Sequence, residues 1–423
     1  MRSAIVSTAM LVLVFGGTAQ GASYRILHDF CAEMDCADGA YPFGSMALDT
    51  QGNLYGTASG GTGHSGIVFE LQRGRGKKFK IQTLYNFCKE DGCLDGQLPH
   101  GVIRDVSGNL YGMTYYGGTS NDGVAYRLAP RRKGDWKQTL LQTFAGPNGS
   151  TPDDAFGYVG ATSGQPYDGT SPLYGTTVDG GTDPQGGTVF TLTPNGAHWT
   201  FETIYNFISG SGNAGSPFTT PVLDASGNLF GTTADGSGAV YELTHGGGGW
   251  SEKVLYAFCD TCNDNTIWPG ELTFDTAGAL VGATASSGPY CGFDGQPVRC
   301  GGGVFRLAPD GAAWDYSALY YFCAKNKQCR DGEDGEISNA KVGDASGNTY
   351  GTASSGGKYH GGVLYRIRTD GTYEVVHDFC STSSCTDGGE PEQLIVAADG
   401  KTLYGIAAYG GAYGKGLIFE YAP

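Results

Sequence analysis

The chain has 423 residues and a formal net charge of −16, from 42 Asp and Glu against 26 Lys and Arg. This balance argues against a nucleic-acid partner, because phosphate binding needs a basic face. Aromatic residues make up 12% of the chain, a content that argues against a disordered protein.

Residues 1–22 are predicted to form a secretory signal peptide. Arg2 supplies the positive charge, residues 9–15 form a short apolar core, and Ala19-Gln20-Gly21 provides a small-residue cleavage site. The apolar run is too short to span a bilayer, and no later stretch is long and apolar enough for a membrane helix. A buried N-terminal strand is the alternative for this segment. We therefore expect a secreted or periplasmic protein whose residues 23–423 form one domain.

A hexapeptide of the type Gly-Asn-Leu-Tyr-Gly-Thr begins at Gly52, and seven variants of it occur along the chain. Self-similarity of this kind indicates a repeat architecture. The glycine after the aromatic position is expected to permit close packing between neighbouring units, with Leu54 and Tyr55 facing opposite sides of a sheet. The seven copies are marked by Gly56, Gly112, Gly175, Gly231, Gly282, Gly351 and Gly405.

The first repeat is predicted to contain four short strands, A to D, at residues 42–48, 53–58, 66–71 and 79–87. In strand C, Ile67, Phe69 and Leu71 face one way and Val68 and Glu70 the other. Alternation with Gly-rich turns is typical of antiparallel strands. The A–B turn begins at Asp49, and Asp followed by Gly favours a turn. A calcium loop is the alternative, but its further oxygen ligands are missing.

Seven units of this kind predict an all-β fold, a seven-bladed β-propeller of four-stranded antiparallel blades. Residues 24–30 match the strand D pattern, whereas residues 417–421 near the end of the chain match strand C. We therefore expect the N-terminal strand to complete the last blade, which removes an open edge. An open β-repeat solenoid is the alternative.

Twelve cysteines fall into six close pairs. The even count, the tight pairing and the signal peptide predict local disulfides in an oxidising compartment. Each short loop would contribute about 2 kcal/mol on the chain-entropy model. A zinc site would need ligands from different repeats. The predicted bridges are Cys31–Cys36, Cys88–Cys93, Cys259–Cys262, Cys291–Cys300, Cys323–Cys329 and Cys380–Cys385.

All six predicted bridges decorate one face of the propeller. In an A–B–C–D meander the B–C turns and the D-to-A connections emerge at the same end, and these segments carry the cysteines and many acidic residues. Rigid loops on a scaffold are where binding sites usually occur, although such loops also serve solubility and protection from proteases. The candidate binding residues are Asp38, Asp95, Asp331, Asp387, His64, His360, Tyr115, Tyr116 and Tyr409.

Each of these candidates also has a structural alternative. The tyrosines could stack on sugar rings or peptides, or pack blades together. His64 and His360 occupy similar B–C turns, where a metal pair or solvated turn histidines are both conceivable. No metal site and no cofactor is predicted.

The A–B turn with its hexapeptide, the Gly-Gly turn, strand C and the end of strand D together form a composite motif. This motif resembles the GloVer tandem-repeat family of bacterial proteins. It is carried here by residues 49–57, 60–61, 66–71 and 84–87 and by their later copies, over nearly the whole mature chain. The resemblance implies an exported protein with propeller-like repeats, and it supplies no catalytic residues to carry over.

The chain contains no G-x-S-x-G, H-E-x-x-H or P-loop motif. It therefore predicts a monomeric, exported binding or interaction scaffold that uses its acidic, disulfide-bearing face, with an extracellular glycan, peptide or protein as the ligand. A polysaccharide lyase or glycoside hydrolase with carboxylates in the propeller funnel is one alternative. A structural envelope protein with no small ligand is the other.

Overall fold

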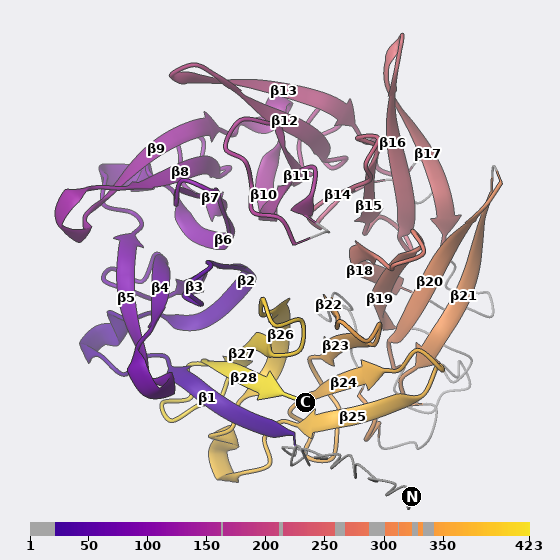
Figure 1. Cartoon of the computed structure of the whole chain (residues 1–423). Coiled ribbons are helices and arrows are strands. Elements are labelled where there is room, and N and C mark those ends of the chain that lie inside the picture. Colours follow the sequence, from indigo (N-terminus) through magenta and orange to yellow (C-terminus); the bar gives the residue numbers. More distant parts are fainter. Residues whose placement is uncertain are drawn as a thin grey trace, which may run out of the picture.

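Seven four-stranded antiparallel sheets surround a central axis, as the blades of a β-propeller (Figure 1). The computed structural model describes residues 22–161, 164–210, 215–258, 267–286, 301–311, 313–323, 329–332 and 342–423. Residues 1–21, which include most of the predicted signal peptide, lie outside this part. None of the helices among the described residues has the length and apolarity that crossing a bilayer requires.

The strands of each blade follow one another from the axis outward. Blade 1 contains β2 (Ala40–Leu48), β3 (Leu54–Ser59), β4 (Ile67–Arg73) and β5 (Phe79–Asn86); blade 2 contains β6 (Gln97–Arg104), β7 (Leu110–Tyr116), β8 (Val124–Pro130) and β9 (Trp136–Thr143); blade 3 contains β10 (Ser150–Gly157), β11 (Leu173–Asp179), β12 (Thr188–Asn195) and β13 (His198–Asn206); blade 4 contains β14 (Val222–Leu223), β15 (Leu229–Thr233), β16 (Ala239–Gly246) and β17 (Gly249–Ala257).

The remaining blades have the same order. Blade 5 contains β18 (Ile267–Phe274), β19 (Leu280–Ser286), β20 (Gly303–Asp310) and β21 (Ala313–Tyr321); blade 6 contains β22 (Val342–Gly343), β23 (Thr349–Ala353), β24 (Val363–Ile367) and β25 (Tyr373–Asp378); blade 7 contains β26 (Gly389–Val396), β27 (Leu403–Tyr409), β28 (Leu417–Ala422) and β1 (Ser23–Asp29). Short 3-10 turns occur at η1 (Met34–Cys36), η2 (Arg75–Lys77), η3 (Asp91–Cys93), η4 (Arg132–Gly134), η5 (Gly146–Asn148) and η7 (Ser383–Cys385).

The N-terminal strand closes the ring. β1 pairs antiparallel with β28, from Ser23 opposite Ala422 to Asp29 opposite Leu417, and Figure 1 shows the indigo β1 beside the yellow β28. An ion pair of 2.8 Å between Arg25 and Glu420 spans the same two strands. The predicted closure is confirmed, and it excludes the open solenoid.

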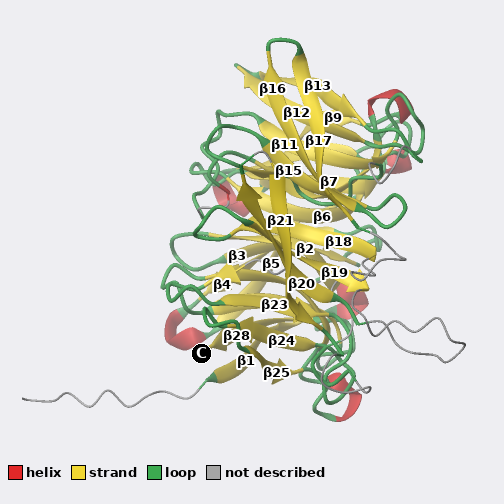
Figure 2. Cartoon of the chain, turned by 90° about the vertical axis from the view of Figure 1, so that its right-hand side faces the viewer, coloured by secondary structure: helices red, strands yellow, loops and turns green. Residues whose placement is uncertain are grey.

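Two loop-bearing faces result from the antiparallel order (Figure 2). The D-to-A connections and the B–C loops emerge at one face, which we call the disulfide face. The A–B and C–D turns emerge at the other, which we call the turn face. Alternation along the strands then buries both sides of each blade. Ile67, Phe69 and Leu71 of β4 pack toward blade 7, and Val68 packs toward blade 2, as predicted.

The hexapeptide glycine pairs with an aromatic residue of strand C in every blade. A Cβ atom on Gly56 would lie 2.7 Å from Cζ of Phe69, and one on Gly405 would lie 2.2 Å from Cζ of Phe419. The ring therefore lies across the backbone of strand B, where only glycine leaves room. The seven pairs are Gly56–Phe69, Gly112–Tyr126, Gly175–Phe190, Gly231–Tyr241, Gly282–Phe305, Gly351–Tyr365 and Gly405–Phe419.

Each of these rings also contacts the buried Phe at the end of strand D in the preceding blade. The ring centroids are 5.1 Å apart at the closest seams and 5.5 Å at the widest. The glycine thus acts within its own blade, by admitting a ring that then seals the seam to the neighbour. The contacts are Phe30–Phe69, Phe87–Tyr126, Phe144–Phe190, Phe207–Tyr241, Phe258–Phe305, Phe322–Tyr365 and Phe379–Phe419.

Leu54 and Tyr55 face opposite sides of blade 1, as the sequence predicts. Leu54 belongs to the cluster shared with blade 7, and Tyr55 to the cluster shared with blade 2. The Tyr55 hydroxyl lies 2.9 Å from the Glu70 carboxylate and 3.2 Å from that of the turn residue Asp49, and it donates its one proton to either of them. The hexapeptide therefore packs both of its large side chains into seams.

Four of the six predicted disulfides are present, namely Cys31–Cys36, Cys88–Cys93, Cys323–Cys329 and Cys380–Cys385. Each follows directly on the strand-D Phe, on the disulfide face. The four cysteines of Cys259–Cys262 and Cys291–Cys300 lie outside the described residues, so those two bridges stay predictions.

We expect Gly56→Ala to lower the free energy of unfolding by about 1–3 kcal/mol, because the added methyl group collides with the Phe69 ring. The matched control is Gly146→Ala, since a Cβ there has nothing within 4 Å. Urea denaturation measures both. Adding Phe69→Leu to Gly56→Ala should recover part of the loss. Additive effects of the two changes would contradict a direct contact.

Peptide mapping of the unreduced protein should find six local disulfide links. A link that joins two different D-to-A connections, or a link from Cys291 to any residue but Cys300, would contradict the local pairing. Reduced and alkylated protein serves as the control.

Candidate functional site

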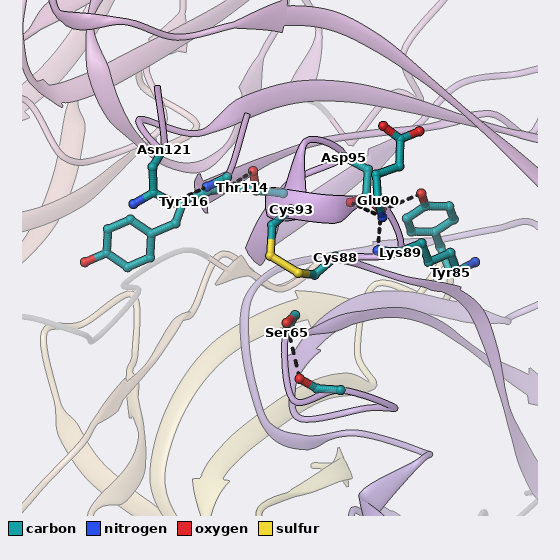
Figure 3. The surroundings of a disulfide bond; sticks show 12 residues. Ser65, Tyr85, Cys88, Lys89, Glu90, Cys93, Asp95, Thr114, Tyr116 and Asn121 are labelled. Atoms are coloured by element: carbon teal, nitrogen blue, oxygen red, sulfur yellow. Dashed lines mark hydrogen bonds between the residues drawn. A yellow bond between two sulfur atoms is a disulfide. The ribbon is translucent and has the colours of Figure 1, made fainter. Parts of the chain in front are cut away.

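The four aspartates that were predicted to bind a ligand instead form hydrogen bonds inside the disulfide loops. Each lies two residues after the second cysteine of its loop. Asp95, which is 1% exposed, accepts hydrogen bonds from the Tyr85 hydroxyl at 2.8 Å and from the Lys89 N–H at 3.1 Å. Figure 3 shows Asp95 turned toward Tyr85, on the side of the Cys88–Cys93 bridge away from Tyr116.

The other three loop aspartates have equivalent partners. Asp38 accepts from the N–H groups of Ala32 and Glu33 at 3.1 and 3.2 Å. Asp331 accepts from the Tyr320 hydroxyl at 2.6 Å. Asp387 accepts from the Ser381 N–H at 2.9 Å, and these bonds lower the pKa of its carboxyl group against the opposing effect of burial. Each of the four carboxylates therefore helps to hold its loop, although Oδ1 of Asp331 is buried without a hydrogen-bond partner among the described residues.

The predicted histidines occupy equivalent turn positions in the B–C loops. His64 and His360 have left-handed backbones, with φ of 58° and 63°, and Asn121 has the same conformation in blade 2. The N–H of His64 donates to the Gly61 carbonyl over 3.0 Å. Asn and His are enriched in this conformation, so the turn explains these residues without a ligand. Among the described residues, no group of three or more His, Cys, Asp and Glu side chains could hold a metal ion.

The predicted tyrosines lie where strand B ends on the disulfide face. Tyr116 and Tyr409 are equivalent residues and are 38% and 46% exposed. Tyr115 is half-buried, and its ring contacts those of Tyr116 and His100 at centroid distances of 4.9 and 5.4 Å. Tyr115 thereby connects the predicted residues to a group that the sequence analysis missed.

That group consists of Phe43, His100, Tyr115 and Asp153, and we call it the axial cluster. Nδ1 of His100 lies 2.5 Å from Oδ1 of Asp153. The Phe43 ring contacts the His100 ring edge-on, with 3.7 Å between the ring centroids. Phe43, His100 and Asp153 come from the innermost strands of blades 1, 2 and 3, so residues more than fifty positions apart meet beside the axis.

A shared sequence feature could have located this cluster. Phe43, His100 and Asp153 each follow the proline of strand A, which is Pro42, Pro99 or Pro152. Aligning the repeats on this proline places the three residues in one column, whose other members are Phe218, Gly270 and Glu392. The residue in this column is Phe in two of the six blades that have the proline, and it is different in each of the other four. In the seams, by contrast, the same Gly and the same Phe occur in every blade.

Hydrogen bonds also join the innermost strands of different blades. Asp154 of blade 3, which is 7% exposed, accepts from the Ser45 N–H of blade 1 at 3.2 Å and from the Thr220 hydroxyl of blade 4 at 2.7 Å. The Gln393 amide of blade 7 donates to Glu271 of blade 5 over 3.2 Å. Side chains therefore connect the inner strands of neighbouring blades and of blades one apart.

Glu392 of β26 belongs to this axial region and is half-buried. Burial, followed by the charges of Glu390 and Asp154, raises the pKa of its carboxyl group to about 8. Glu392 is therefore largely protonated at neutral pH, when it can donate as well as accept a hydrogen bond.

A cavity of about 320 Å³ lies on the turn face between blades 1 and 7, lined in part by Asp49, Arg73, Asp399 and Tyr404. Its carboxylates are occupied in their own turns. Asp49 accepts from the N–H groups of Gln51 and Asn53 at 2.9 Å each, and Asp399 accepts from the Lys401 N–H at 2.8 Å. These bonds confirm the A–B segments as turns, and none of the predicted binding residues lines the cavity.

Replacing Glu392 by Gln is expected to remove a loss of stability at alkaline pH. The raised pKa means that the folded protein binds this proton more tightly than the unfolded chain. The bound proton stabilises the folded protein fully below the ordinary pKa of Glu. This stabilisation is lost as the pH rises through the raised pKa of Glu392 in the folded protein. Urea midpoints of Glu392→Gln should therefore exceed those of the wild type by more at about pH 9 than at about pH 5.

The control for this comparison is Glu202→Gln, since Glu202 is exposed on the outer strand β13. The Glu202→Gln curve supplies the baseline for removing one surface carboxylate. If the urea midpoints of Glu392→Gln and of the wild type changed with pH in the same way, the raised pKa of Glu392 would be contradicted.

The sequence pattern of the Gloeobacter/Verrucomicrobia repeat matches residues 13–171, 93–293 and 290–423. Together these matches cover nearly the whole chain, and they confirm the family that the composite motif predicted. A search of curated proteins returned no match.

Solved structures share the fold at low sequence identity. The extracellular domain assigned to a hybrid two component system from B. thetaiotaomicron is 11% identical, with a TM-score of 0.55, over 94% of this chain and 40% of that one. A domain assigned to a one component system from the same organism is 12% identical, with a TM-score of 0.52, over 90% and 40%. A protein assigned as a 6-phosphogluconolactonase from Bacteroides uniformis is 13% identical, with a TM-score of 0.48, over 87% and 89%. Identities this low show the fold alone.

Proposed function

The chain belongs to the Gloeobacter/Verrucomicrobia repeat family, and from this premise we propose that it is an exported glycan-binding module whose site is the axial cluster on the disulfide face. The observation that carries the proposal is the convergence of Phe43, His100 and Asp153 from three blades. The seams do not require these residues, because other blades place different side chains in the same column.

The chemistry of the cluster suits a sugar ring. Aromatic faces pack against the apolar C–H groups of a sugar, and a few fixed polar groups orient its hydroxyls. Asp153 holds Nδ1 of His100, which fixes the imidazole and directs Nε2 away from the carboxylate. Phe43 and Tyr115 contact the same imidazole from β2 and β7.

Exposed tyrosines extend this surface across the disulfide face. The exposed fractions of these side chains range from 38% for Tyr116 to 53% for Tyr413. Aromatic side chains that stay exposed while so many others fill the seams support a ligand-binding surface. The tyrosines are Tyr41, Tyr116, Tyr359, Tyr409 and Tyr413.

The charge around the axis restricts the ligand. Asp153, Asp154 and Glu390 lie on the innermost strands, and the whole chain carries a net charge of −16. Carboxylates accept hydrogen bonds from hydroxyl and amine groups, and they repel anions. Neutral or amine-bearing glycans therefore fit this surface better than polyuronates do.

The His100–Asp153 pair also favours a second function, a polysaccharide lyase or glycoside hydrolase. A histidine held by a carboxylate is a common general acid or base. Turnover of a bound glycan, detected by new reducing ends or an unsaturated product and lost in His100→Ala, would establish this enzyme in place of the binding module.

Binding is tested on the oxidised mature protein with an array of neutral, amine-bearing and uronate-bearing glycans, followed by calorimetry on the glycans that bind. We expect Phe43→Ala and His100→Ala each to weaken binding about tenfold, a loss of about 1.4 kcal/mol. The matched controls are Phe79→Ala and His198→Ala, which change the first residues of β5 and β13 at the turn face.

Two results would overturn the proposal. One is that no neutral or amine-bearing glycan binds, as expected for a structural envelope protein or a peptide binder. The other is that Phe43→Ala and His100→Ala bind as tightly as the two control variants.

A further inference from the structure

Among the described residues, five that are not glycine have left-handed backbones where the chain enters strand A on the disulfide face. Their φ angles lie between 49° and 53°. Each directly precedes a proline. A positive φ is uncommon for residues other than glycine and is a true outlier for bulky or β-branched ones. The five are Tyr41, Leu98, Thr151, Ser216 and Glu390.

The left-handed conformation lets the main chain join neighbouring blades. The N–H of Tyr41 donates to the Lys415 carbonyl of the preceding blade over 2.7 Å, and the N–H of Glu390 donates to the Gly361 carbonyl over 3.0 Å. The same bond occurs at the other three positions, from Leu98 to Ser65, from Thr151 to Asp122 and from Ser216 to Gly186.

The proline that follows completes the junction. It packs against a glycine of the preceding blade at the start of strand C, so closely that a Cβ on Gly66 would lie 2.3 Å from Cδ of Pro99. The same contact joins Gly123 to Pro152, Gly187 to Pro217, Gly362 to Pro391 and Gly416 to Pro42. Main-chain and proline atoms therefore recur at all five junctions. Side-chain contacts across a junction differ from one to the next, since the hydroxyls of Tyr41 and Ser216 contact Lys415 and Gln185 of the preceding blade.

Glycine would satisfy these junctions with the least strain. Instead the five positions hold one aromatic, one aliphatic, two hydroxyl and one carboxylate side chain. Strain that is retained at equivalent positions while the side chain varies motivates a functional hypothesis. Each of these residues comes two positions before a member of the axial column, so the five surround the axial cluster on the same face.

We propose that these five side chains are the specificity-determining residues of the axial site and contact the sugar units that flank the one held by the axial cluster. The inference rests on the proposed function. Tyr41 offers a stacking surface that is 41% exposed, Thr151 and Ser216 offer hydroxyl groups, and Glu390 is an exposed carboxylate. Glu390 therefore favours an amine-bearing unit beside blade 7, and the ligand is an oligosaccharide.

Local contacts give these side chains a competing, purely structural explanation. Nζ of Lys415 lies 2.5 Å from the Tyr41 hydroxyl, and Oγ1 of Thr151 donates to the Ser150 carbonyl over 2.7 Å. If such contacts were the reason for the side chains, removing them would destabilise the fold. Substitution by glycine separates the two explanations, because it relieves strain in this conformation.

The variants are Thr151→Gly and Glu390→Gly, with Thr200→Gly as the matched control, since Thr200 is exposed in the regular outer strand β13. We expect the urea midpoints of Thr151→Gly and Glu390→Gly to equal or exceed that of the wild type, and that of Thr200→Gly to fall. Both test variants should weaken oligosaccharide binding about fivefold and leave the affinity for a single sugar unit unchanged. Glu390→Gly should also lose the preference for amine-bearing chains.

Two outcomes would overturn the inference. One is a loss of stability in Thr151→Gly and Glu390→Gly as large as in Thr200→Gly, which would make the side chains structural. The other is unchanged affinity and selectivity in both variants while His100→Ala still weakens binding, which would leave the proposed function standing. If His100→Ala has no effect either, the proposed function itself fails.

Discussion

The packing of an aromatic ring on a glycine backbone is the contact on which the propeller depends. Gly56 leaves room for the Phe69 ring, and that ring meets Phe30 of the preceding blade at 5.3 Å. Burying one aromatic side chain removes 150–250 Å² from water, which is worth roughly 4–6 kcal/mol before conformational entropy is subtracted. A short disulfide loop contributes about 2 kcal/mol. The seams are therefore held mainly by aromatic burial, and the disulfides shape the loops above them.

Blade 3 supports this division between seams and loops. Its entry has no cysteine pair, and a 3-10 turn takes the place of the disulfide loop, with the Ala145 N–H donating to the Asn148 side chain over 2.7 Å. The adjoining seam nevertheless has the same ring contact, Phe144 on Phe190 at 5.1 Å. Because the seam forms without a bridge beside it, the bridges serve to rigidify the connections on one face. Their buried aspartates act in the same way, since Asp95 joins its loop to the Tyr85 hydroxyl of strand D.

The sequence predicted the fold well because the fold depends on local patterns that repeat. Alternation along strand C, the recurring glycine and the match between the N-terminal strand and strand D were sufficient to predict seven blades and their closure. The inward direction of Asp38 and Asp95 was not predictable in this way, since it depends on how a bridged loop folds back on strand D. The axial cluster was missed for a related reason. His100 and Asp153 lie in different repeats, and only the curvature of the whole ring brings Nδ1 within 2.5 Å of the carboxylate.

The two faces differ in how far local hydrogen bonds account for their polar residues. On the turn face, Asp49 and Asp105 each accept bonds from two N–H groups and an Asn side chain of the same turn, and the other A–B turns repeat this arrangement in part. Residues that recur with the same local partners are explained by folding. On the disulfide face, the residues that differ between blades are those nearest the axis, and some of them are retained in a conformation that glycine would adopt with less strain. Sequence variation between blades and backbone strain therefore occur together beside the axis on the disulfide face, where the blades meet. A ligand that spans several blades can use both, since each blade contributes a different group to the same surface.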